Sequence, residues 1–113
     1  MKTCIFCKIA KKQIPSEIVY ENDLVIAFKD INPLAKVHIL VIPKKHIETI
    51  DHLDPKDEKL VGAVIYAAQK IARKLGIAGN GYRLVFNVKS HGGQIVDHIH
   101  LHLIGGEKLG KMC

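Results

Sequence analysis

The chain has 113 residues, 48% of them hydrophobic and 25% charged, which are the size and composition of one globular domain over residues 1–113. Its formal net charge of +6 comes almost wholly from scattered lysines, and without an arginine cluster or a run of aromatic residues we expect no nucleic-acid partner. No apolar run is long enough to cross a bilayer and the N-terminus does not resemble a secretory signal, so we expect a cytoplasmic protein with no membrane partner.

The N-terminal part of the chain predicts a short helix and a β-hairpin. Residues 5–12 are expected to be helical up to a proline-containing turn. The runs 17–21 and 24–28 are rich in β-branched and aromatic residues, and Asn22 and Asp23 between them favour a turn. We therefore expect two antiparallel strands joined at this turn.

An interior strand and one long helix follow the hairpin. Residues 37–42 are apolar on both faces apart from His38, as in a strand that is covered on both sides. Asp54 followed by Pro55 predicts the start of a helix, and apolar residues then recur at helical spacing until Gly76. We expect the alanine-rich part of this helix to offer a surface for close packing against a partner chain.

Two further strands, over residues 82–88 and 98–104, complete the predicted sheet. A loop that contains Gly92 and Gly93 separates them and allows antiparallel pairing. The order of elements predicts an α+β fold with a mostly antiparallel sheet, one long helix and a short N-terminal helix. The last strand must cover its apolar face and one edge, which favours a homodimer.

Three histidines, His98, His100 and His102, alternate with apolar residues in the last predicted strand. Because successive side chains of a strand point to opposite faces, the three imidazoles share one face and the apolar residues form the core face. The simplest interpretation is that the three histidines form a solvated polar face of the strand. Such a face could be made of any polar residues, however, and does not require a histidine at three alternating positions. One metal ion cannot readily bind all three, since the outer two Cα atoms are roughly 13 Å apart along an extended strand.

The remaining interpretation makes one imidazole a nucleophile and the others its supporting groups. A neutral imidazole has a free ring nitrogen that attacks an electrophilic phosphorus without an added base. Its other nitrogen must then carry a proton held by an acceptor, and backbone N–H groups of the glycine loop could approach an anion. Only His100 has a histidine neighbour on both sides, so we expect it to be the nucleophile.

Cys4 and Cys7 form a Cys-x-x-Cys pair, and the third cysteine, Cys113, is left without a role. An odd number of cysteines argues against a disulfide framework. The pair fits either two thiols of the core or two ligands of a metal site, and a structural zinc site needs two more ligands.

The segment NVKSHGGQIVDHIHLHLIG, residues 87–105, resembles the histidine triad (HIT) motif, and IFCKIAKKQIPSEIVYEND, AFKDINP and HILVIPKKHI are similar to the Hint branch of that family. The resemblance implies an α+β HIT fold whose sheet continues across a homodimer. It also implies hydrolysis at the α-phosphate of a purine nucleotide, with AMP, GMP or their phosphoramidates as ligands and the P–N bond as the bond cleaved. The alternatives are a nucleotide-binding interaction protein with vestigial hydrolysis and a metal-handling protein.

Carried over residue by residue, the resemblance implies a set of catalytic and substrate-binding positions. His100 corresponds to the histidine that attacks the α-phosphorus, His102 to the one that contacts the phosphate oxygens, and His38 to a fourth histidine that supports the nucleophile. Asp30 matches the acid that holds the ribose hydroxyls, although from the residues alone it is a turn-forming aspartate. The remaining positions match the base pocket and the phosphate side: Phe28, Ile31, Asn87, Gly93 and Gln94.

The same resemblance supplies the missing metal ligands. Many bacterial members of the family hold zinc with the cysteine pair, a histidine at the position of His46 and the first triad histidine. We therefore expect a structural zinc ion on Cys4, Cys7, His46 and His98, with core thiols as the alternative.

Two departures from the Hint branch concern the leaving group. Ile95 stands where the branch commonly has a serine thought to serve the leaving group, and isoleucine cannot donate a proton. The sequence also ends at Cys113 without the aromatic, proline-bearing tail of some relatives. We expect substrates with good leaving groups to be favoured.

Overall fold

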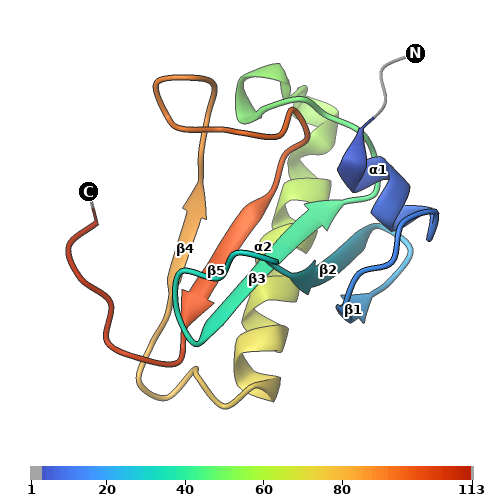
Figure 1. The fold of residues 1–113 in the computed structure, drawn as a ribbon. Helices are drawn as coiled ribbons and strands as arrows, with labels where there is room; N and C mark the ends of the chain where they lie inside the picture. The colour runs from blue at the N-terminus through green and yellow to red at the C-terminus, as the bar shows by residue number, and fades with distance from the viewer. Residues whose placement is uncertain (1–3, 113) are drawn as a thin grey trace.

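Five antiparallel strands form one sheet in the order β1-β2-β3-β5-β4 in the computed structural model, which describes residues 4–112. Cys113, for which no role is predicted, lies outside the described residues. The elements follow one another as α1 (Ile5–Ala10), β1 (Ile18–Glu21), β2 (Val25–Lys29), β3 (Val37–Pro43), two 3-10 turns (Ile50–His52 and Pro55–Asp57), α2 (Glu58–Lys74), β4 (Arg83–Phe86) and β5 (Leu101–Gly105) (Figure 1). The predicted α+β fold is confirmed.

The centre of the sheet is covered on both faces, which explains why β2 and β3 are almost entirely apolar. On β2, Val25 and Ala27 belong to the core cluster that includes α2, whereas Ile26 and Phe28 belong to the cluster that includes α1. Residues of β3 divide between the two clusters in the same alternation. Figure 1 shows the long α2 behind the sheet, and the short α1 near one end of β3. We call the side of the sheet covered by α1 the α1 face.

Helix α2 packs its alanine-rich stripe onto the sheet of its own chain. Ala67, Ala68 and Ala72 are at most 1% exposed and lie in the same cluster as Ile71. Small side chains allow the helix to approach the strands closely, which is why alanines recur on this stripe. Our expectation that these alanines pack against a partner chain is therefore wrong.

The last strand is shorter than predicted and is not an edge strand. β5 lies between β3 and β4, so β4 forms the edge. β5 begins only at Leu101, because the preceding N–H groups bond elsewhere: that of His98 donates to the Val96 carbonyl and that of Ile99 to the Ile47 carbonyl. The prediction of a strand over residues 98–104 is correct only for its second half.

Both helices differ from the prediction at one end. Helix α1 ends at Ala10 instead of residue 12, because Lys12 has a φ of 62°. Asp54 and Asp57 form the reciprocal capping bonds expected at a helix start, but they begin a 3-10 turn, and α2 itself starts at Glu58. Among residues 4–112, no helix is both long and apolar enough to span a membrane.

Candidate active site and metal centre

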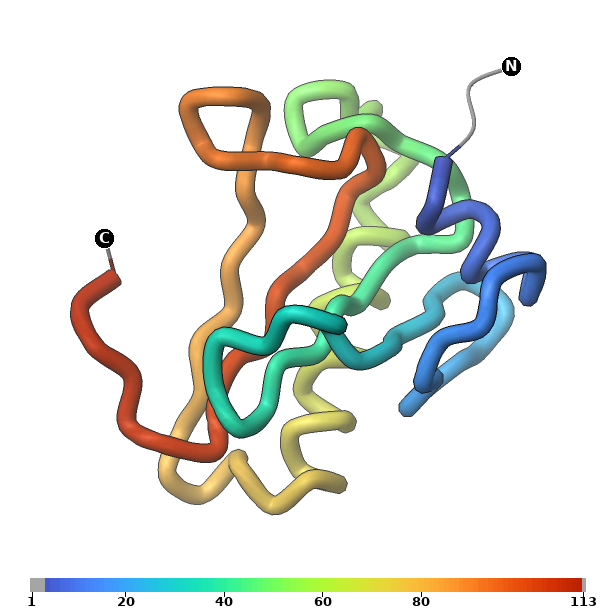
Figure 2. Tube along the Cα trace, in the orientation of Figure 1, coloured from blue at the N-terminus to red at the C-terminus, as the bar shows by residue number. Residues whose placement is uncertain are grey.

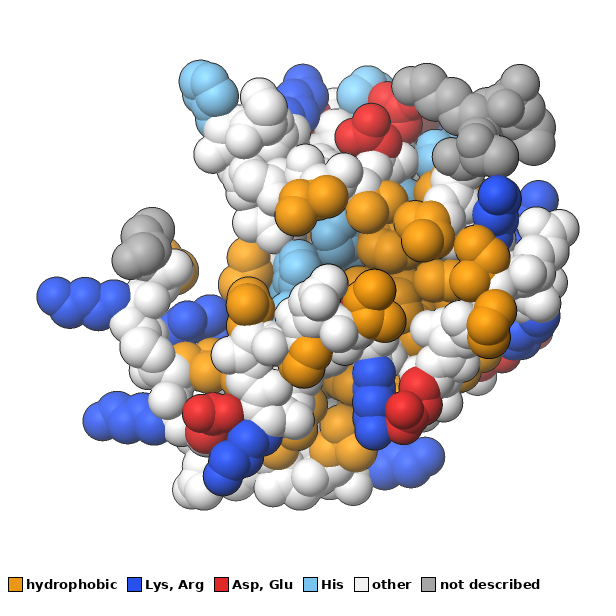
Figure 3. Space-filling view, viewed as in Figure 1, with side chains coloured by type: hydrophobic (Ala, Val, Ile, Leu, Met, Phe, Trp, Pro, Cys, Tyr) orange, Lys and Arg blue, Asp and Glu red, His pale blue; other side chains and the backbone are white. Residues whose placement is uncertain are grey.

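A pocket of about 760 Å³ lies on the α1 face of the sheet. Phe28 of β2 and Leu40 of β3 line one side of it, and Gly93 of the loop between β4 and β5 lines the other. His102 of β5 and His100, which directly precedes that strand, also line the pocket. Figure 3 shows histidine side chains at the bottom of a hollow that is surrounded by hydrophobic ones. The triad face is therefore a partly enclosed, mostly apolar site and not a solvated surface.

The ring of His100 is fixed by a hydrogen bond and by an aromatic contact. Its Nδ1 lies 2.8 Å from the main-chain oxygen of His98, and because a carbonyl only accepts, Nδ1 carries the proton. Phe6 of α1 packs edge-on against the ring with centroids 5.1 Å apart, and His100 is 7% exposed. In the neutral ring, Nε2 is left with a free lone pair, as a nucleophile requires.

His38 and His102 form a second pair in which the hydrogen bonds assign the protons. The N–H of Leu34 donates to Nδ1 of His38 at 3.0 Å, so the neutral His38 ring carries its proton on Nε2. That Nε2 lies 2.9 Å from Nδ1 of His102, which must accept. His102 consequently carries its own proton on Nε2 and has an N–H group to donate to an anionic ligand.

Burial keeps both rings of this pair neutral at physiological pH. Desolvation lowers the pKa of His102 to about 4, and the neighbouring His100 acts in the same direction. Desolvation also lowers the pKa of His38, although the carboxylate of Asp30 opposes it. The proton assignments above therefore hold at neutral pH.

Asp30 stabilises a turn, as the sequence alone predicts, and it also lines the pocket. Its Oδ1 accepts the N–H of Asn32 at 2.8 Å, and its Oδ2 lies 3.4 Å from Nε2 of His38. Both Asp30 and Ile31 line the pocket. Ile31 is 89% exposed, so an apolar surface is available there to a ligand.

Gln94 holds the loop between β4 and β5 together. Its Nε2 donates to the main-chain oxygens of Glu48 and Val96 at 2.6 and 2.9 Å, and its Oε1 accepts the N–H of Lys89 at 3.0 Å. Figure 2 shows this loop beside the segment that follows β3. The resemblance implies a phosphate-side position for Gln94 and gives no sign of this bracing role.

The glycines of this loop are required by its backbone. A Cβ on Gly92 would lie 2.4 Å from the main-chain oxygen of Val88, which no side chain tolerates. The side-chain amide of Asn87 donates to the Gly92 oxygen at 2.7 Å. The N–H groups of Gly93 and Gln94 donate to carbonyls inside the loop, so our expectation that the loop offers N–H groups to an anion does not hold for these two.

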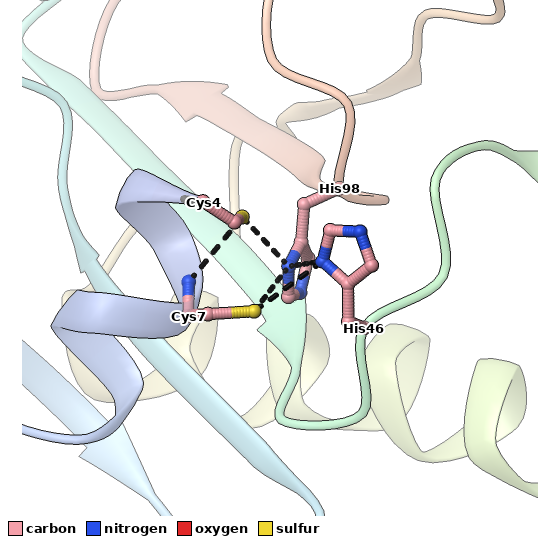
Figure 4. A group of neighbouring side chains, drawn as sticks. All are labelled: Cys4, Cys7, His46 and His98. Carbon is pink, nitrogen blue, oxygen red and sulfur yellow. Dashed lines mark hydrogen bonds between the residues drawn. The ribbon is translucent and has the colours of Figure 1, made fainter. Parts of the chain in front are cut away.

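Four predicted metal ligands converge beside α1 (Figure 4). Nδ1 of His98 lies 3.4 Å from Sγ of Cys4 and 3.6 Å from Sγ of Cys7, and Nδ1 of His46 lies 3.3 Å from Sγ of Cys7. The two Nδ1 atoms are 3.2 Å apart, and the four candidate ligand atoms all lie within 4.8 Å of one another. These residues are close enough to bind one metal ion.

The spacing fits tetrahedral coordination. Bond lengths of about 2.1 Å to nitrogen and 2.3 Å to sulfur place two nitrogens about 3.4 Å apart and a nitrogen and a sulfur about 3.6 Å apart. Nε2 of His98 lies 2.8 Å from the Pro43 oxygen and donates to it, which leaves the lone pair of Nδ1 for a metal. Burial, and then the Cys4 thiol, raise the pKa of Cys7, so a cation is needed to hold the Cys7 sulfur as a thiolate.

Asp30, His38 and His102 form another close group, but their geometry does not suit a metal. The distance of 2.9 Å between the ring nitrogens of His38 and His102 is that of a hydrogen bond. The N–H of Leu34 also occupies the other nitrogen of His38, so Nε2 must keep its proton and has no lone pair to give.

The model of the HIT domain family matches residues 11–109 of this chain. The chain belongs to the HIT family. It is 52% identical over 108 residues to the purine nucleoside phosphoramidase of Escherichia coli (strain K12), and the match covers 96% of this chain and 91% of that protein.

Solved structures of HIT proteins have the same fold. The HIT family hydrolase from Legionella pneumophila Philadelphia 1 superposes with a TM-score of 0.94 at 49% identity, covering 96% of both chains. The HIT family hydrolase from Clostridium thermocellum superposes with a TM-score of 0.96 at 46% identity, covering 100% of this chain and 99% of that one. The predicted HIT fold is confirmed, and the chain is a hydrolase of this family.

Proposed function

We propose that this protein hydrolyses the bond between the α-phosphate of a purine nucleotide and an amine, as in an adenosine phosphoramidate or an adenylated amine. The observation that carries the proposal is the 2.8 Å contact from His100 Nδ1 to the His98 oxygen, because it leaves Nε2 with a lone pair beside a ligand-sized pocket. Similarity to the purine nucleoside phosphoramidase of Escherichia coli supports the substrate class.

The reaction proceeds in two displacements at phosphorus. First, Nε2 of His100 forms a bond to the α-phosphorus while the bond from phosphorus to the amine breaks, and the amine takes a proton from solvent because Ile95 has none to give. Then water attacks the phosphorus, the bond to His100 breaks, and the nucleoside monophosphate leaves as the water proton returns to solvent. His102 donates from Nε2 to a phosphate oxygen in both steps, which stabilises the charge that develops there.

The nucleoside occupies the β2 side of the pocket in this proposal. Phe28 is 3% exposed and Ile31 89% exposed, so the base packs between a fixed ring and a solvent-facing aliphatic side chain. Asp30 accepts from the ribose hydroxyls, and Asn87 and Gly93 approach the phosphate from the opposite side of the pocket. Apolar packing of this kind accepts either adenosine or guanosine.

The metal in this proposal is zinc and its role is structural. Two thiolates and two imidazoles are ligands that zinc prefers, and four protein ligands leave no open position for substrate. Cys4 is the N-cap of α1 and Cys7 lies on it, and this helix of only six residues is marginal without further support. Zinc would tie α1 to His46 and His98 and so keep Phe6 against His100.

The proposed working unit is a cytoplasmic homodimer. The edge strand β4 carries unpaired main-chain groups, and Leu84 on it is 38% exposed. On α2, Ile65 and Tyr66 are 44% and 58% exposed. A second copy that pairs along β4 would extend the sheet and cover apolar surface.

Mass spectrometry of the intact protein mixed with an adenosine phosphoramidate tests the function. The enzyme is expected to gain the mass of one adenylyl group on His100 and to release AMP. If the protein binds the phosphoramidate but forms no adduct and releases no AMP, a nucleotide-binding protein with vestigial hydrolysis is favoured instead. The observation that supports this alternative is that Ile95 cannot donate a proton.

A further inference from the structure

Ile95 places a branched apolar side chain in water beside the active site. It is 92% exposed, and it lines the same pocket as His100. The shape of its loop does not depend on it, because Gln94 supplies the bracing hydrogen bonds. A side chain that contributes neither to the core nor to the loop is free to contact a ligand.

The chemistry of the site says which part of the ligand lies there. In a displacement at phosphorus, the leaving group points away from the attacking nitrogen. His100 is 7% exposed at the bottom of the pocket, so the leaving group points out towards the mouth. Because Asp30 and Phe28 mark the nucleoside side, the side left for the leaving group is the loop between β4 and β5, which carries Ile95.

The loop side of the pocket offers no charge to a polar leaving group. The pocket residues that this loop contributes are Asn87, Gly93, Ile95 and Val96. The charged pocket residues lie on the opposite side, where Lys29 pairs with Glu17 at 2.6 Å and Asp30 faces His38. Among the pocket residues that this loop contributes, an ionic group on the departing amine would therefore find no charged partner, whereas an apolar group would cover the surface of Ile95.

We propose that Ile95 is a specificity-determining residue that favours substrates whose leaving amine carries an aryl or branched alkyl group. This inference rests on the proposed phosphoramidate hydrolysis. One apolar contact at a pocket rim changes kcat/KM by roughly three- to tenfold, less than an enclosed contact would. The effect is expected on substrate choice and not on the stability of the protein.

The test compares the adenosine phosphoramidates of benzylamine and 2-methoxyethylamine, two primary amines of similar basicity. The parent protein is expected to cleave the benzylamine compound with a roughly three- to tenfold higher kcat/KM. Ile95→Ala should bring the ratio close to one, and Ile95→Val should keep most of it. Leu24→Ala is the matched control, because Leu24 is 52% exposed and is not a pocket residue.

A kcat/KM ratio between the two compounds that is near one in the parent protein, or that is unchanged in Ile95→Ala, would overturn this inference. The proposed function would still stand in either case, provided that both compounds release AMP. Ile31→Ala serves as a second comparison, since Ile31 lies on the nucleoside side and should change both substrates by the same factor. If neither compound is cleaved and no adduct forms on His100, the proposed function fails and this inference fails with it.

Discussion

The main-chain oxygen of His98 accepts the Nδ1 proton of His100 at 2.8 Å, while the ring of His98 lies 3.4 Å from the Cys4 sulfur. One residue therefore takes part in both the proposed metal centre and the orientation of the proposed nucleophile, through different atoms. Because the contact to His100 uses the main chain, replacing the His98 side chain and replacing His100 should have separable effects.

Replacing His100 tests the nucleophile. His100→Asn should keep nucleotide affinity within about tenfold, because the other pocket residues remain, and should lower the single-turnover rate by several orders of magnitude, since the covalent route is lost. The rate is measured by rapid quench with an adenosine phosphoramidate, and the adduct by mass spectrometry. His52→Asn, which replaces an exposed histidine, should match the parent protein. Near-parental turnover by His100→Asn would show that another group attacks the phosphorus.

Removing a thiol tests the metal centre. Cys4→Ser and Cys7→Ser should each lower the melting temperature by about 5 °C or more, because loss of one of four ligands releases the ion that holds α1. Elemental analysis of the parent protein should find about one zinc per chain. Cys113→Ser is the control for loss of a thiol and should retain both metal and melting temperature. A metal-free parent protein whose melting temperature does not respond to a chelator would rule the site out.

The strands follow from the sequence because they depend on spacing within a segment, whereas the cluster of candidate metal ligands does not. Residues 37–42 are apolar at every position but His38, and the structure covers that strand on both faces. The positions of Cys4 and His98 are 94 residues apart, so only the resemblance to a family could pair them before the structure did. Spacing within one segment is visible in a sequence, whereas contacts between segments are not.

The sequence could not predict the hydrogen bonds between side chains and the main chain. The bracing bonds of Gln94 depend on where Glu48 and Val96 lie in space, and the start of β5 depends on an N–H that bonds to Ile47 instead of to a strand. Phe6 gives a weak signal, as an aromatic residue between two cysteines. Its contact with His100 exists only because the fold brings α1 to the end of the triad.

Removing the side-chain amide of Gln94 tests the bracing role of that residue. Gln94→Ala should destabilise the loop locally by about 1–3 kcal/mol, because two carbonyls and one N–H lose their partner. Hydrogen exchange of the Lys89 amide reports this directly and should become faster. Gln13→Ala, at an exposed position, is the matched control. If Gln94 acts only by contacting the phosphate, the Lys89 amide will exchange at the parental rate in the free protein.

Lowering the pH should destabilise the protein through His102. Its pKa is about 4 in the folded chain and 6.5 when unperturbed, so between these values the unfolded chain binds more protons and the free energy of unfolding falls as the pH falls. Asp57, whose pKa is lowered by its hydrogen bond with Lys45, loses its contribution only at lower pH. Urea midpoints measured from pH 7 to pH 4.5 should fall steadily for the parent protein and less steeply for His102→Gln. His52→Gln, at an exposed position, should keep the parental slope. Equal slopes for the parent protein and His102→Gln would mean that His102 is not held neutral by burial, and the assignment of its Nδ1 as an acceptor for the His38 proton would then have to be withdrawn.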